Sequence, residues 1–148
     1  MDTMNRRGFT LIEVLIVIVL IGAMSAIAFP RIGDAVVKQS VASARAGVVG
    51  FVAQARGTAI QRGATTRLIL ASNQLWVEAA NPVTGVVERV GNREDFGARY
   101  TVTVTPTNDT ILYDARGIGM GSAQKSIVVT RGSYAQKVVI SVVGRVIQ

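Results

Sequence analysis

The sequence contains neither cysteine nor histidine. Without these side chains the protein can form no disulfide bond, use no thiolate nucleophile or imidazole base, and offer no thiolate or imidazole ligand to a metal ion. Its nine acidic residues form no recognisable catalytic arrangement, and aromatic residues make up only 5% of the 148 positions. We therefore expect a protein that is not an enzyme, with no catalytic residue, no cofactor and no metal site.

Apolar residues are concentrated near the N-terminus. Seventeen of the 21 residues from Phe9 to Phe29 are apolar. A helix needs about 20 such residues to cross the hydrocarbon core of a bilayer. The segment is therefore long enough to span a membrane, and it contains one acidic residue, Glu13.

Composition alone leaves two interpretations of this segment. One is a cleaved secretory signal, because Ala26-Ile27-Ala28 has the pattern of a signal peptidase site and Arg6-Arg7 loosely matches a twin-arginine export signal. The other is an uncleaved signal anchor, whose orientation stays open because basic residues flank both ends. Neither explains Glu13, since an ionised carboxylate costs about 2.5–3.5 kcal/mol at the centre of a membrane helix and less near the interface.

A third interpretation comes from a resemblance. Residues 6–15 read RRGFTLIEVL, which resembles the class III leader of type IV prepilins and type II secretion pseudopilins. The resemblance implies that a membrane-bound prepilin peptidase cuts between Gly8 and Phe9 and then methylates the new amino group of Phe9. It also places Glu13 at the fifth mature position, where the family carries its glutamate.

Three residues in or directly after the apolar segment have expected roles in assembly. In lipid, Glu13 needs a cationic partner, and the freed amino group of a neighbouring subunit would supply one; the alternative is a carboxylate that simply reaches the interface. Gly22 and Pro30 lie where pilin helices often carry a glycine and a kinking proline. A proline inside a helix removes one backbone hydrogen bond and bends the axis, whereas the alternative is that Pro30 marks the end of the membrane span.

A helical pattern continues beyond the apolar segment. Apolar residues repeat at steps of three and four along one side of a helix, at Val37, Val41, Ala44, Val48, Val52, Ala55 and Ala59. Gly63 is a typical C-terminal stop, so we expect one helix over about residues 10–62. Gly47, Gly50 and Gly57 each weaken a helix by up to about 1 kcal/mol relative to alanine, which predicts close packing against a sheet or another subunit.

Four basic residues lie in a narrow arc beside this apolar stripe, namely Arg31, Lys38, Arg45 and Arg56. We expect them to form a solvated helix edge. The alternative is that the first two contact lipid head groups or acidic neighbours in a filament.

The residue pattern in the second half of the chain is typical of β-strands. We expect a hairpin from residues 65–71 and 75–79, a strand over residues 99–105 with Tyr100, Val102 and Val104 on one face, and strands over residues 127–131 and 137–143. Residues 81–85 and 92–97 are expected to be surface loops.

These elements predict an α+β protein in which a long N-terminal helix, transmembrane in its first half, packs on an antiparallel β-sheet head. The expected division is a leader at residues 1–8, a transmembrane or filament-core helix at 9–30, an amphipathic continuation at 31–63, and a β-rich head at 64–148.

Segments of the head also resemble minor pilins of the GspH/FimT type. The resemblance rests on Ala55-Arg56 with residues 59–63, on residues 113–117, and on residues 139–146, which are expected to hold the last strand of a second sheet. It identifies the chain as a minor pilin or pseudopilin that joins or primes the tip of a type II secretion pseudopilus or a type IV pilus.

The formal net charge of +7 favours anionic partners. Some minor pilins of this type bind DNA through a basic tail, which Gly144-Arg145 resembles, although Ile147 replaces its second arginine. The candidate DNA or anion contacts are Arg116, Arg131, Lys137 and Arg145. Because a stacking platform is not evident, such binding would depend on phosphate contacts and on salt concentration.

Two weaker patterns carry no expected site. Residues 117–121 are glycine-rich, but no phosphate-binding lysine follows them, so they are expected to form a turn between strands. Asp109 and Asp114 lack the further oxygen donors that a calcium site needs.

The leading hypothesis is a minor pilin or pseudopilin in the bacterial inner membrane, with its head in the periplasm. Its expected partners are prepilin peptidase, other pilins or pseudopilins, inner membrane lipid and, in the alternative, DNA taken up during transformation. A third hypothesis is a soluble exported protein released by ordinary signal peptidase.

Overall fold

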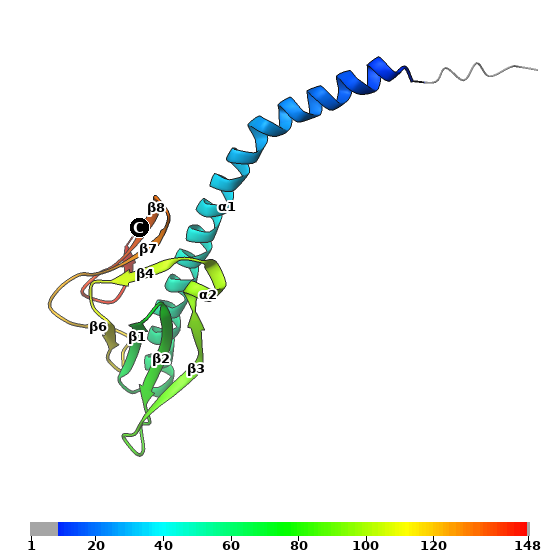
Figure 1. Cartoon of the computed structure of the whole chain (residues 1–148). Helices are drawn as coiled ribbons and strands as arrows, with labels where there is room; N and C mark the ends of the chain where they lie inside the picture. Colours follow the sequence, from blue (N-terminus) through cyan, green and yellow to red (C-terminus); the bar gives the residue numbers. More distant parts are fainter. Residues whose placement is uncertain (1–8, 148) are drawn as a thin grey trace, which may run out of the picture. The chain divides into compact units, whose positions relative to one another are not determined.

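A computed structural model describes residues 9–147, and the chain divides into two compact units between Val36 and Val37. We call described residues 9–36 the stem and described residues 37–147 the head. The helix α1 (Leu11–Arg62) begins in the stem and continues into the head, where a second helix and nine strands follow it in the described part of the chain (Figure 1). The predicted leader, residues 1–8, lies outside the described residues.

The elements after α1 follow one another with short connections. Their bounds are β1 (Thr66–Ala71), β2 (Gln74–Ala80), β3 (Val87–Asp95), α2 (Phe96–Tyr100), β4 (Thr103–Pro106), β5 (Thr110–Tyr113), β6 (Gly119–Met120), β7 (Lys125–Arg131), β8 (Tyr134–Ile140) and β9 (Val146–Ile147). This combination confirms the α+β class expected from the sequence.

The stem is a helix with apolar side chains on all sides. It starts at Thr10, whose hydroxyl oxygen accepts a hydrogen bond from the Glu13 backbone N–H at 3.3 Å, the usual function of an N-cap residue. The helix then continues without a break through Gly22 and Pro30. None of its most apolar 18-residue window is buried within the structure, so these side chains lack a covering layer in the single described chain.

The head part of α1 has one buried side only. The predicted stripe is confirmed: Val37 is half-buried, and the buried members are Val41, Ala44, Val48, Val52, Ala55 and Ala59. Helix α1 ends at Arg62 because Gly63 takes a left-handed backbone conformation, with φ of 58°.

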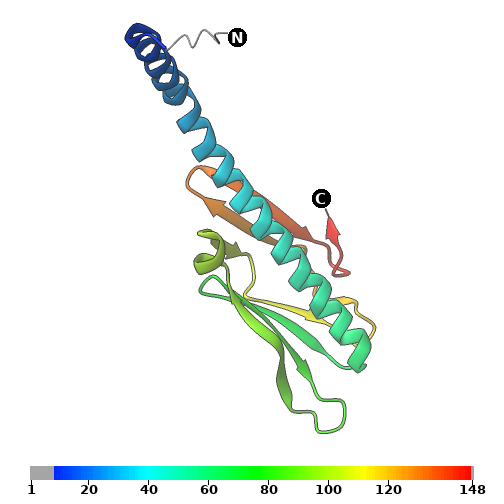
Figure 2. The same ribbon diagram turned by 90° about the vertical axis from the view of Figure 1, so that its right-hand side faces the viewer.

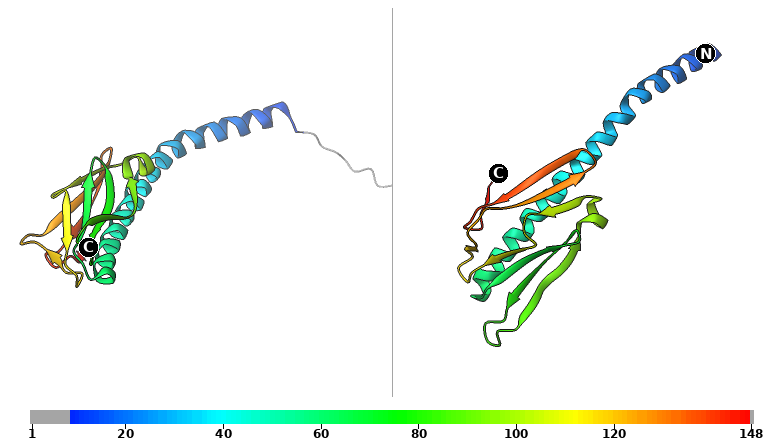
Figure 3. Two further views of the ribbon diagram at one scale, coloured as in Figure 1. Left: turned by 90° about the horizontal axis from the view of Figure 1, so that it is seen from below. Right: turned by 60° about the vertical axis from the view of Figure 1, so that its left-hand side comes forward.

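Two antiparallel sheets pack against this buried side. The first has the strand order β3-β2-β1-β5-β6 and the second has the order β4-β7-β8-β9. Strands of both sheets lie on the same side of the head part of α1 (Figures 2 and 3). The Gly119 backbone N–H donates to the Val143 carbonyl at 3.1 Å, which links β6 of the first sheet to the turn that follows β8 of the second.

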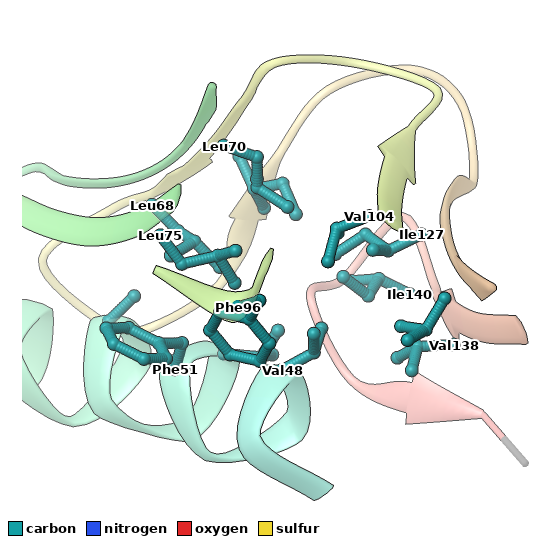
Figure 4. Packing of buried hydrophobic residues seen from close by; sticks show 14 of the residues in the cluster. Val48, Phe51, Leu68, Leu70, Leu75, Phe96, Val104, Ile127, Val138 and Ile140 are labelled. Atoms are coloured by element: carbon teal, nitrogen blue, oxygen red, sulfur yellow. The ribbon is translucent and has the colours of Figure 1, made fainter. Parts of the chain in front are cut away.

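The core lies between α1 and the two sheets. Phe96 of α2 is fully buried, and its ring centroid lies 6.0 Å from that of Phe51 on α1 (Figure 4). The first sheet contributes Leu68, Leu70 and Leu75, and the second contributes mainly valine and isoleucine, including Val104, Ile127, Val138 and Ile140. One continuous apolar cluster therefore holds the helix and both sheets together.

The prediction for residues 92–105 is wrong in its first part. The loop expected over residues 92–97 is instead the end of β3 and the start of α2, and the strand expected over residues 99–105 begins only at Thr103, because Phe96–Tyr100 forms α2. The Asp95 carboxylate caps α2 by accepting a hydrogen bond from the Ala98 backbone N–H at 2.8 Å, and Thr101 ends the helix in a left-handed conformation. This local capping prevails over the alternating pattern, although Val102 and Val104 are buried as expected.

The strands near the C-terminus also differ from expectation. Strand β8 begins at Tyr134 and ends at Ile140, so residues 141–143 are not part of it. Gly144, with φ of 80°, helps to form a turn, and the last strand of the second sheet is β9. The short strand β5 was not predicted from the sequence.

Gly47 differs from Gly50 and Gly57 in its surroundings. A Cβ atom at Gly47 would lie 3.0 Å from Cε1 of the buried Phe96, whereas a Cβ atom at Gly50 would meet nothing within 4 Å. We therefore predict that Gly47→Leu lowers the free energy of unfolding by about 1–3 kcal/mol through overpacking. Gly50→Leu is predicted to raise it by up to about 1 kcal/mol through helix propensity.

Chemical unfolding of the full chain in detergent, followed by circular dichroism, measures both changes. Equal effects of the two substitutions would contradict the packing of α2 against Gly47.

Candidate functional site

The stem carries the residues predicted to act in processing and assembly. Gly8 lies outside the described residues, and Phe9, the expected first residue of the mature chain, is 83% exposed. Glu13 lies in the first turn of α1, where the positive end of the helix dipole favours a carboxylate. Its neighbours on the helix are exposed apolar side chains, such as Ile12 and Ile16.

Glu13 has no cationic partner among the described residues. A carboxylate in an apolar environment is unfavourable unless a cation or hydrogen-bond donors compensate it. If the stem is immersed in lipid or packed among other helices, a partner for Glu13 has to come from outside this described chain.

The four candidate anion contacts do not form one patch. Arg131 ends β7 beside the β7–β8 turn, whereas Arg145 follows β8 and lies at the other end of the second sheet. The Arg131 guanidinium is half-buried and donates to the Ser40 hydroxyl of α1. Lys137 lies on the other face of β8 from the buried Val138, and it is exposed.

Arg116 is held at the turn that follows β5. Its guanidinium pairs with the Asp114 carboxylate, with Nη2 and Oδ2 3.1 Å apart, although the Arg116 side chain is 79% exposed. The same carboxylate accepts hydrogen bonds from the backbone N–H groups of Ile118, at 2.8 Å, and of Arg116, at 2.9 Å. These hydrogen bonds, the one from Ile118 first, lower the pKa of Asp114.

The two weak patterns of the sequence, the glycine-rich residues 117–121 and the pair of Asp109 and Asp114, lie around β5 and the turn that follows it. The turn expected over residues 117–121 is confirmed only in part: Gly117 and Ile118 lie between β5 and β6, whereas Gly119 and Met120 form β6 itself. The described residues contain no group of three or more acidic side chains that could hold a metal ion, and the Asp114 carboxylate is already hydrogen-bonded within its own turn.

A second rigid turn, residues 141–145, lies against the core. The buried hydroxyl of Tyr113 donates to the Gly144 carbonyl at 3.3 Å, and the Ser141 hydroxyl accepts from the Arg145 backbone N–H at 3.0 Å. A Cβ atom at Gly144 would lie 2.4 Å from Cε1 of Tyr113, and one at Gly119 would lie 2.6 Å from the Gly144 nitrogen. Glycine is therefore required at both positions by close approach of the chain.

A groove separates this turn from α1. It has a volume of about 360 Å³, and we call it the C-terminal groove; its lining residues are Val49, Val52, Ala53, Arg56, Gly57, Ile60, Gly144, Arg145 and Val146. Arg56 comes from α1 and Arg145 from the turn, and neither has a carboxylate oxygen within 4.0 Å among the described residues.

The sequence did not predict that Arg56 lines this groove. Arg56 was grouped with the basic residues of a solvated helix edge, and it is indeed exposed. Its proximity to the turn of Arg145 is a long-range contact, which no spacing along the helix could reveal. The only available signal was its presence in a segment that resembles the GspH/FimT type.

Comparisons with known proteins agree with these observations. Residues 3–29 match the model of the prokaryotic N-terminal methylation motif, and residues 46–144 match the model of type II transport protein GspH. The chain is 31% identical over 159 aligned positions to the pilin-like protein PilA1 of Thermus thermophilus, which covers 96% of this chain and 97% of that protein.

The fold of this chain is similar to that of a solved structure. The crystal structure of the type IV minor pilin FimU from Pseudomonas aeruginosa matches with a TM-score of 0.61 at 13% sequence identity. The match covers 74% of this chain and 87% of that chain, and it confirms the arrangement of a long N-terminal helix with antiparallel sheets.

The buried Tyr113 predicts a pH dependence of stability. Burial raises the pKa of its hydroxyl to about 12, although the charge of Arg56 acts in the opposite direction. Because this pKa is above the usual value of about 10 for an unfolded chain, the protonated hydroxyl stabilises the fold below about pH 10, and this stabilisation is lost as the pH rises through about 12.

Between about pH 9 and pH 11, the wild type is predicted to lose about 1 kcal/mol more unfolding free energy than Tyr113→Phe. Chemical unfolding of the full chain in detergent at both pH values measures the difference. Identical losses for the two proteins would show that Tyr113 is not buried as described.

Proposed function

Since the chain belongs to the GspH family of minor pilins and pseudopilins, we propose that it is made as a precursor, which a prepilin peptidase cuts between Gly8 and Phe9. The same peptidase then methylates the amino group of Phe9. The N-terminal methylation motif at residues 3–29 supports this assignment, because it includes both residues.

The stem anchors the protein in the inner membrane, and the head lies in the periplasm. The observation that supports this arrangement is the exposed apolar surface of the stem. Fully burying one large apolar side chain is worth about 1.5–3 kcal/mol. A stem with apolar side chains on all sides is therefore stable in lipid or among other helices, and unfavourable in water.

Glu13 then guides the subunit from the membrane into the filament. Its carboxylate pairs with the methylated amino group of the neighbouring subunit, which keeps its positive charge after methylation. This pair removes the cost of an uncompensated charge in an apolar environment, and it aligns the two stems along the filament. Gly22 and Pro30 allow the helix to bend where the stems pack together.

In the filament, the protein joins or primes the tip of a type II secretion pseudopilus or a type IV pilus. Membership of the GspH family supports this placement. DNA binding during transformation receives less support, because Arg131 and Arg145 lie at opposite ends of the second sheet and Arg131 is bonded to Ser40.

Intact-protein and peptide mass spectrometry of the membrane-bound protein tests the processing step. In cells with an active prepilin peptidase, the mature chain is expected to begin at Phe9 and to carry one added methyl group on its amino nitrogen. In cells without the peptidase, residues 1–8 remain attached. An N-terminus at Phe29, the product of ordinary signal peptidase, or an intact Met1 in peptidase-positive cells, would overturn the proposal.

Replacing Glu13 tests the assembly step. Glu13→Gln removes the charge but keeps the shape, so the variant is expected to be processed and to remain in the membrane. Its incorporation into sheared filaments is predicted to fall about tenfold or more, which corresponds to a loss of about 1.4 kcal/mol.

Ser25→Ala serves as the matched control, because the Ser25 hydroxyl bonds only the Ile21 carbonyl of the same helix among the described residues. The control is expected to assemble like the wild type. Equal incorporation of Glu13→Gln and the wild type would refute the role of the carboxylate.

A further inference from the structure

The floor of the C-terminal groove is apolar and accessible. Ala53, Gly57 and Ile60 line it from α1, and Ile60 is 53% exposed although it is a large apolar residue. Val146 of β9 lines it from the other side. A surface of this kind gains free energy when an apolar side chain covers it.

Gly57 keeps this floor open. A Cβ atom at Gly57 would meet nothing within 4 Å, so nothing in the described chain requires a glycine there. Gly47 differs, since the ring of Phe96 fills the space beside it. A glycine inside a helix weakens it by up to about 1 kcal/mol relative to alanine. Gly57 therefore lowers the stability of α1, and no close contact within the described head compensates for this.

The wall opposite α1 is already ordered. The turn of residues 141–145 is fixed by the Tyr113 hydroxyl, by the Ser141 hydroxyl, and by close contact with Gly119. Binding to a preformed site loses little conformational entropy, which favours affinity.

The charges at the groove identify the chemistry of its occupant. Among the described residues, four other arginines have a carboxylate oxygen within 4.0 Å, namely Arg62, Arg67, Arg99 and Arg116. Arg56 and Arg145 lie one on each side of the groove, and they are among the described arginines that have no such carboxylate oxygen. An occupant with a carboxylate would therefore complement both sides.

Two other occupants fit less well. A second copy of this chain that presented the same groove would bring arginine against arginine, which is repulsive. DNA would place phosphates over an apolar floor, where Ala53, Gly57 and Ile60 offer no hydrogen-bond donor from their side chains.

We propose that the C-terminal groove binds an acidic segment of a different filament subunit. An apolar side chain of that segment covers Gly57 and Ala53, and its aspartate or glutamate pairs with Arg56 and Arg145. The inference rests on the proposed function, because it assigns one partner contact of the same assembly.

The experiment is photo-cross-linking in membranes of cells that assemble the filament. Gln61→Cys places a unique thiol one helical turn beyond Gly57, since the chain has no other cysteine. A benzophenone maleimide on this thiol is expected to cross-link to another subunit with a methylated N-terminus, at a segment that contains an aspartate or glutamate. The cross-link is predicted to fall about tenfold when Gly57→Leu or Arg56→Glu is added.

Two substitutions outside the groove serve as controls. Gly50→Leu also adds a leucine at an open position of α1, and Arg89→Glu also reverses one exposed charge of the head. Both are expected to leave the cross-link unchanged. Thermal unfolding of every variant in detergent checks that Gly57→Leu remains folded, as expected for a position where a Cβ atom meets nothing within 4 Å.

The outcomes separate the inference from the function on which it rests. An unchanged cross-link in Gly57→Leu and Arg56→Glu, or a cross-link only to a second copy, would overturn the inference, while a methylated Phe9 would leave the proposed function intact. Binding of duplex DNA that Arg56→Glu abolishes, together with an unchanged cross-link, would assign the groove to DNA instead. An N-terminus other than Phe9 would refute both proposals.

Discussion

The structure depends on how α1 distributes its apolar side chains. In the stem they surround the helix, whereas in the head they form one stripe that both sheets cover. Each half of α1 therefore needs a different environment. The head half finds it within the same chain, but the stem half needs lipid or the helices of other subunits. The membrane anchoring and the filament assembly that we propose both follow from this one requirement.

Much of the fold was predictable because its signals are local and repeated. The steps of three and four from Val37 to Ala59, followed by Gly63, specify the head half of α1 and its end. Alternation likewise predicted most of β1, β2 and β7. Helix α2 was missed because one cap at Asp95 and one left-handed residue at Thr101 outweigh an alternating pattern. The short strands near the C-terminus depend on contacts between distant segments, which no local pattern encodes.

The candidate functional residues also divide into those with a local sequence signal and those that depend on contacts between distant segments. The role of Glu13 stays a prediction, and it could be proposed from the sequence because an acid within an apolar run is conspicuous and the leader resembles a known one. Of the four candidate anion contacts, Arg131 instead holds the β7–β8 hairpin to Ser40 and Arg116 is paired with Asp114. The C-terminal groove was not predictable, since Arg56 and Arg145 come together only when the turn of residues 141–145 packs beside α1. Where α1 lacks a partner within the chain, at Glu13 and at Gly57, we place contacts with other subunits.

The distance between Glu13 and its neighbour in the assembled filament tests this account most directly. Cryo-electron microscopy of the filament tip, at a resolution that shows side chains, measures it. The account predicts a Glu13 carboxylate oxygen within about 4 Å of the methylated amino nitrogen of the adjacent subunit, inside a bundle of stems. A Glu13 side chain that faces lipid or solvent, with no cationic group beside it, would contradict the account.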